Sequence, residues 1–76
     1  SQDDVARIEA MIDAETDGRA ALAALDRLPP GERVAVEMRI LDDHEYADVA
    51  DATGTTVGAA RVRVHRGLKR IEEELS

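Results

Sequence analysis

The chain has 76 residues, a formal net charge of −7 and an apolar fraction of 43%, which is enough for one small core. It contains no Cys, Phe or Trp and a single Tyr, so disulfides and Cys-ligated zinc are excluded and any core must be aliphatic. No apolar run approaches the roughly 20 residues of a membrane span, and no signal-peptide pattern opens the chain. A cytoplasmic protein without a membrane partner is therefore expected.

The first expected element is an amphipathic helix over residues 1–16. Three apolar side chains in it recur at the spacing of one helical face: Val5, Ile8 and Ile12. Asp17 and Gly18 then favour a break in the chain. Residues 19–28 are expected to form a second helix, with an apolar stripe made of Leu22, Leu25 and Leu28.

Pro29 and Pro30 end that second helix, because a residue before proline is pushed out of the helical conformation. Pro30 suits the first turn of the next helix, which is expected over residues 30–41. Its apolar positions make a broad stripe, typical of a helix packed on two sides: Val34, Met38 and Leu41, widened by Val36 and Ile40. The turn "DDHE" follows.

Two further helices complete the chain. A short helix over residues 45–52 is expected to bury Tyr46, Val49 and Ala50. Gly54 fits the left-handed residue that closes a helix, and Thr56, rather than Thr55, fits the N-cap of the next one. The last helix is expected over residues 57–75, with a buried seam at intervals of three or four residues: Ala60, Val64, Gly67, Ile71 and Leu75.

Charge is distributed unevenly along these elements. Residues 1–55 carry five basic and fourteen acidic side chains, whereas residues 56–71 carry five basic and no acidic ones. The last helix therefore has a cationic face, mostly off its seam, within an acidic chain. Glu72, Glu73 and Glu74 follow directly, and we expect them to be a solvated helix end.

A short helix, a three- to four-residue turn with glycine and a longer basic helix together predict a helix-turn-helix, in an all-α bundle of four or five helices. The second helix of this motif enters the major groove and presents its N-terminal residues to base edges. Thr56 and the first amides can hold a phosphate at the positive helix end, and the small residues Gly58 and Ala59 allow close approach. Arg61, His65 and Arg66 lie about one turn apart and can reach bases or phosphates.

The segments "LPPGERVAVEMRI" and "YADVADATGTTVGAARVRVHRGLKRIEEEL" resemble region four of sigma-70-type factors, most closely the extracytoplasmic-function group. The likeness covers about residues 20–75 without a gap. The positions that match the pattern of this family are Leu28-Pro29, Arg33, Tyr46, Asp48, Val49, Ala50, Gly54, Gly58, Arg61, Arg63, Val64 and Arg66. The chain departs from the pattern at Ala59, Ala60 and Val62, which replace Thr, Val and Ser, and at Glu45, which replaces a capping Ser.

This resemblance implies a winged-helix-like domain without a wing, over residues 18–76, and a linker helix from a preceding domain over residues 1–17. It implies binding of promoter minus-35 DNA, docking on the flap of the RNA polymerase core and, in many relatives, binding of an anti-sigma factor. The predicted DNA contacts are Thr55, Thr56, Gly58, Ala59, Arg61, Val62, Arg63, His65, Arg66 and Lys69, with electrostatic support from Arg70.

Other functions remain open at this stage. A helix-turn-helix that has lost most DNA contact and binds a protein partner fits the acidic first 55 residues, and a LuxR-like reader shares the turn but fits the flanking segments less well. Val62 is either a neutral surface residue or a contact to a thymine methyl or a partner. We expect no catalysis and no cofactor, because His65 has no nucleophile beside it, and no metal, because adjacent residues in "DDHE" rarely converge on one ion.

Overall fold

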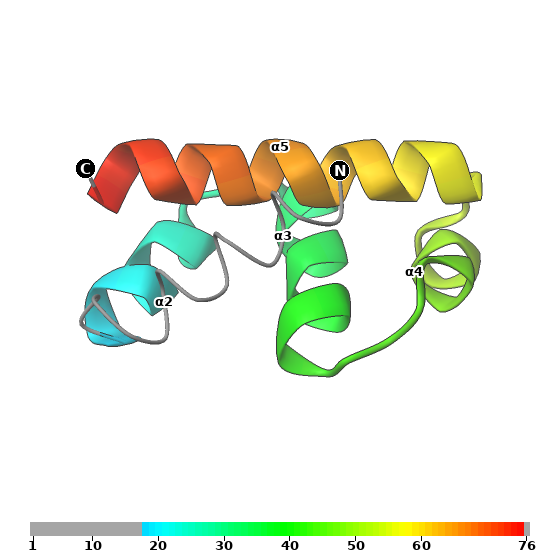
Figure 1. Cartoon of the computed structure of the whole chain (residues 1–76), viewed down its shortest axis with the longest axis horizontal. Coiled ribbons are helices and arrows are strands. Elements are labelled where there is room, and N and C mark those ends of the chain that lie inside the picture. The colour runs from blue at the N-terminus through cyan, green and yellow to red at the C-terminus, as the bar shows by residue number, and fades with distance from the viewer. Residues whose placement is uncertain (1–17, 76) are drawn as a thin grey trace.

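The computed structural model describes residues 18–75, and the regular secondary structure within that range is entirely helical. The helices are α2 (Gly18–Asp26), α3 (Pro30–Val36), which runs on into the π-helical turn η1 (Glu37–Leu41), α4 (Tyr46–Thr53) and α5 (Val57–Leu75). The predicted all-α fold is confirmed. The expected helix over residues 1–16 lies outside the described residues. In Figure 1, α5 runs along one side of the molecule, and α2, α3 and α4 lie below it.

Helix α5 organises the core, because it contacts each of the other three α-helices. Its buried ridge contains Ala60, Val64, Gly67, Leu68 and Ile71. The predicted seam is therefore confirmed at four positions, and Leu75 is partly buried against the same core. The predicted seam did not include Leu68, which is completely buried. Its position fits the seam, because it follows Val64 by four residues and precedes Ile71 by three.

Gly67 sets how closely α5 and α3 approach each other. A Cβ atom added at Gly67 would lie 2.5 Å from Cγ2 of Val36 and 3.3 Å from Cδ1 of Leu28. Carbon atoms pack at about 3.5–4.0 Å, so no side chain fits at this crossing without moving a neighbour. The lack of a side chain at position 67 therefore allows the two helices to pack tightly.

The predicted apolar stripe of α2 is wrong at Leu22. Leu25 and Leu28 are buried as expected, but the side chain of Leu22 is 55% exposed and Ala24 is buried instead. Helix α2 ends at Asp26, before the expected end at residue 28. Tight turn bonds follow, from Arg27 N–H to the Ala24 carbonyl and from Leu28 N–H to the Leu25 carbonyl, both 3.1 Å. Leu28 thus packs from the turn, and the buried face of α2 is centred on its last residues.

The predicted face of the helix over residues 30–41 is also wrong in part. Ala35 and Val36 are buried, whereas Val34 and Leu41 are 39% and 60% exposed. One cause is the π-helical turn, in which Asp42 N–H donates to the Glu37 carbonyl five residues back (3.0 Å) and so shifts the helical phase. The second cause is the tight crossing of α3 and α5 at Gly67, which brings Val36 inward. Val34, in α3, and Met38 and Leu41, in η1, are together named the α3 apolar stripe below.

The turn between α4 and α5 has the predicted caps. Gly54 adopts the left-handed conformation (φ 65°), and the following N–H, of Thr55, donates to the Ala50 carbonyl at 2.9 Å. Oγ1 of Thr56 accepts the N–H of Ala59 at 3.1 Å, which makes Thr56 the N-cap of α5. Val49 and Ala50 are buried in α4 as predicted, and Tyr46 is partly buried. Residues 46–75 therefore form a helix-turn-helix.

The N-terminus of α4 lacks a side-chain cap, as the replacement of the usual Ser by Glu45 predicts. Glu45 has the extended backbone of an N-cap residue (φ −75°, ψ 159°) but makes no capping hydrogen bond. Glu45→Ser is therefore expected to be more stable than Glu45→Ala by about 0.5–2 kcal/mol, because the serine hydroxyl can accept an amide of the first turn. Urea denaturation of the two variants measures this difference, and equal midpoints would show that the α4 terminus does not limit stability.

Candidate nucleic-acid interface

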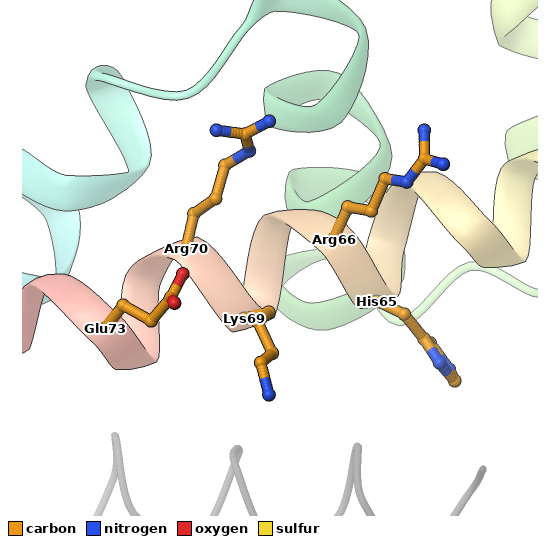
Figure 2. Close-up of a pocket in the computed structure, with 5 residues that line it drawn as sticks. All are labelled: His65, Arg66, Lys69, Arg70 and Glu73. Carbon is orange, nitrogen blue, oxygen red and sulfur yellow. The ribbon is translucent and has the colours of Figure 1, made fainter.

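The outward face of α5 lies opposite its buried ridge and carries basic side chains. Arg61, Arg66 and Lys69 are exposed, Val62 between them is 47% exposed, and His65 is half-buried. These residues recur at intervals of three or four, so they share one side of the helix. Figure 2 shows His65 and Lys69 extending to one side of a shallow hollow along α5 and Arg66 and Arg70 to the other, with Glu73 at its end. We name Arg61, Val62, His65, Arg66 and Lys69 the α5 outer face.

Three cations of this face have charges that the described residues do not neutralise. Within residues 18–75, no ion pair is formed by Arg61, Arg66 or Lys69. Ionic hydrogen bonds are stronger than neutral ones, so cations left without carboxylate partners are suited to bind an anion. All three residues are exposed, as expected for a cationic face that lies mostly off the buried seam.

Arg63 and Arg70 are placed differently, on the side of α5 that faces α3. The guanidinium of Arg63 is half-buried beside Gly31, where an added Cβ atom would lie 3.7 Å from Nη1. Nε of Arg70 lies 2.8 Å from Oε1 of Glu32, whose side chain is only 13% exposed. The charge of Arg70 is therefore largely compensated within the fold. The contacts predicted for Arg63 and Arg70 would require these side chains to turn away from α3.

The N-terminus of α5 supplies groups that can receive an anion. Thr56 Oγ1 accepts the Ala59 amide, which uses one lone pair and leaves the hydroxyl hydrogen available for another acceptor. The amides of Val57 and Gly58 precede the first intrahelical bonds of α5. Gly58 is exposed, and an added Cβ atom would meet nothing within 4 Å, so the backbone here is open to close approach. Thr55 and Ala59 are half-buried beside this end.

Exposed acidic side chains lie at the end of α5, where Glu73 and Glu74 stand, and in a second group around α4. In the turn 42–45 and on α4, five carboxylates are exposed: Asp42, Asp43, Glu45, Asp48 and Asp51. The ion pairs in this region are long, with Asp43 3.7 Å from Arg39 and Asp48 3.8 Å from His44. Among residues 18–75, no group of three or more His, Cys, Asp or Glu side chains is arranged to hold a metal ion. Nor is any helix in that range both long and apolar enough to cross a membrane.

Residues 18–71 match the family model described as "Sigma-70, region 4". The chain belongs to this family. It is 35% identical over 54 residues to a protein named ECF RNA polymerase sigma factor SigE, from Mycolicibacterium smegmatis, a match that covers 71% of this chain and 21% of that protein. It is 35% identical over 57 residues to RNA polymerase sigma factor CarQ of Myxococcus xanthus, over 75% of this chain and 33% of that protein. The chain thus spans a third or less of the length of these relatives. No solved structure matches the chain.

The predicted region-four domain is confirmed by this family match, and its likeness to the extracytoplasmic-function group agrees with the name of the first relative. The individual DNA-contacting residues remain predictions. Sequence reasoning missed a contact of this sigma factor domain: the guanidinium of Arg61 lies over the ring of Tyr46, 5.2 Å from its centroid. The sequence offered one signal for this contact, because Tyr46 is the only aromatic residue of the chain.

Proposed function

We propose that this domain binds the minus-35 element of promoter DNA through the α5 outer face and places it against RNA polymerase during transcription initiation. The observation that carries the proposal is the row of Arg61, Arg66 and Lys69, three exposed cations without carboxylate partners among residues 18–75, beginning one turn after the capped start of α5. Family membership supports a DNA-binding role for this helix.

The arrangement suits a helix that enters the major groove. The groove is about 12 Å wide and an α-helix with its side chains about 10–12 Å, so the exposed side of α5 can lie in it. Thr56 and the first amides then meet a phosphate, while Arg61, His65 and Arg66 face base edges or phosphates. An arginine can bind guanine through two hydrogen bonds, and Val62 offers an apolar contact to a thymine methyl.

The distribution of carboxylates limits the interface at both ends. Glu73, in the turn after Lys69, is exposed at the end of the hollow (Figure 2), so its charge repels phosphates beyond that point. The exposed carboxylates of α4 and the preceding turn repel a duplex that approaches from that side. The DNA contact is therefore expected to be short and confined to the first three turns of α5.

A salt titration tests the proposal. If the three unpaired cations each neutralise one phosphate, the logarithm of the association constant falls with the logarithm of salt concentration at a slope of about −2.7. Fluorescence anisotropy with a labelled minus-35 duplex between 25 and 200 mM salt measures this slope. In parallel, amide chemical-shift changes on adding the duplex should be confined to residues 55–70. A titration that leaves every amide unmoved at the lowest salt would refute DNA binding by this domain.

A protein-docking role has its own support in the α3 apolar stripe. Val34 and Leu41 are 39% and 60% exposed, and Met38 between them is partly buried, so one side of this helix presents apolar surface to solvent. Exposed apolar surface of this kind can pack against a protein partner. The flap of the polymerase core and an anti-sigma factor are the partners we propose for it. The stripe is separate from the α5 outer face, so docking and DNA binding are compatible.

A further inference from the structure

Residues 1–17, which precede α2 and lie outside the described residues, are strongly acidic. They carry one arginine and six carboxylates, which gives this segment a net charge of −5: Asp3, Asp4, Glu9, Asp13, Glu15 and Asp17. Residues 56–71, which make up most of α5, carry five basic and no acidic side chains. The segment and the basic part of α5 therefore have opposite net charges of equal size.

Their patterns of apolar and charged residues are also complementary. The α5 outer face has one apolar side chain, Val62, which is 47% exposed and lies between Arg61 and Arg66. On the helix expected over residues 1–16, a turn of about 100° per residue places carboxylates on both sides of the apolar face. Glu9 and Asp13 flank one side of Val5, Ile8 and Ile12, and Asp4 and Glu15 flank the other. Such a helix can place its apolar side chains against Val62 and its carboxylates against the cations.

The connection between the segment and α5 is short. Residue 17 is joined directly to Gly18, the first residue of α2, and α2 packs against α5. A chain of this length spans about 26 Å as a helix and at most about 56 Å when extended. The longest dimension of the fold is 32 Å, so the segment can reach the α5 outer face. A short tether also gives an effective concentration on the order of mM, at which weak contacts suffice for binding.

We propose that residues 1–17 bind across the α5 outer face and compete there with the duplex. The competition rests on the proposed function, whereas the binding of the segment to α5 does not. The α5 outer face is favoured over the α3 apolar stripe, because the cations beside that stripe are already paired, Arg33 with Glu37 and Arg39 with Asp43. The three exposed cations of α5 have no such partner among residues 18–75. The domain then binds DNA only when the segment has left α5.

A spin label tests where the segment binds. The chain has no cysteine, so Ala10→Cys carries a single nitroxide, on the side of the expected helix opposite its apolar face. At 25 mM salt the label should broaden the amide signals of residues 58–69 more than those of the α3 apolar stripe. The effect should decline at 1 M salt, where the screening length is about 3 Å. An unlabelled 20-base-pair duplex should displace the segment and restore the signals.

Paired charge-removing variants test the competition. Glu9→Gln with Asp13→Asn removes two negative charges from the segment. The control, Asp26→Asn with Asp42→Asn, removes two from exposed residues off α5 that form no ion pair within residues 18–75. Both variants change the net charge equally. The segment variant is expected to bind the duplex about threefold to tenfold more tightly than the control at 50 mM salt, because the segment occupies α5 less.

The outcomes separate this contact from the proposed function. Duplex binding without selective broadening of α5 would overturn the binding of the segment and leave DNA binding by α5 intact. Selective broadening in a protein that ignores every duplex would keep the contact and overturn the proposed function. Equal affinities of the two charge variants would refute the competition. In a mixture of isotope-labelled chains and separate nitroxide-labelled chains, broadened α5 signals would assign the segment to a second copy and overturn the intramolecular contact.

Discussion

Replacing Arg61 and Arg66 together by alanine is expected to reduce duplex binding at least a hundredfold while leaving the helical content unchanged. Both residues are exposed on α5 and form no ion pair within residues 18–75, so their removal leaves no buried carboxylate unpaired there. A hydrogen bond to a charged group contributes about 1.5–3 kcal/mol, and two such losses correspond to a hundredfold or more in affinity. The salt slope should fall from about −2.7 to about −0.9.

The matched control for this pair is Arg19→Ala with Arg33→Ala. These residues lie on α2 and α3 rather than on α5, and their removal changes the net charge by the same two units. Anisotropy titrations of both double variants at 50 mM salt make the comparison. If the two variants bind equally well, the effect is one of net charge, and α5 does not carry the contact.

Gly67→Ala is expected to destabilise the protein clearly. The added Cβ would lie 2.5 Å from Cγ2 of Val36, a side chain that is only 3% exposed and cannot turn into solvent. Overpacking of this kind costs about 1–3 kcal/mol, which exceeds the gain of about 1 kcal/mol from replacing glycine in a helix. Each net kcal/mol lowers the melting temperature of so small a domain by roughly 4–8 °C.

Two controls make the thermal unfolding experiment specific. Gly58→Ala places the same methyl group on the same helix where nothing lies within 4 Å, and it is expected to leave stability unchanged or raise it. The double variant Gly67→Ala with Val36→Ala removes the colliding methyl groups and should recover part of the loss, because the two positions are in contact. A melting temperature for Gly67→Ala at or above that of the parent protein would contradict the tight crossing.

The residues that sequence reasoning placed correctly are those governed by local rules. Gly54 and Thr56 were assignable because a left-handed cap and an N-cap depend on the chain within a few residues. The seam of α5 was readable because the helix is long and has one buried side, so its apolar residues recur with a clear period. The cationic outer face follows from the same period.

The failures have tertiary causes. The helix over residues 30–41 is apolar on several sides, and which side is buried depends on the crossing at Gly67 and on the π-helical turn, neither of which has a local signal. Leu22 is exposed although it lies on a regular stripe, because the short α2 packs through its last residues. The ion pair between Arg70 and Glu32 and the stacking of Arg39 and Arg61 on Tyr46 join distant segments, so no spacing rule predicts them.

Helix α5 contacts every other α-helix of the described fold and also carries the proposed recognition surface. The domain can therefore bind its ligand only when it is folded, because detaching α5 from the other helices would also disrupt the core. Ligand at a hundred times its dissociation constant adds about 2.7 kcal/mol to the free energy of unfolding, a large share of what a domain this small possesses. Binding can consequently be measured on the unlabelled protein, because the increase in its melting temperature on adding ligand reports the affinity.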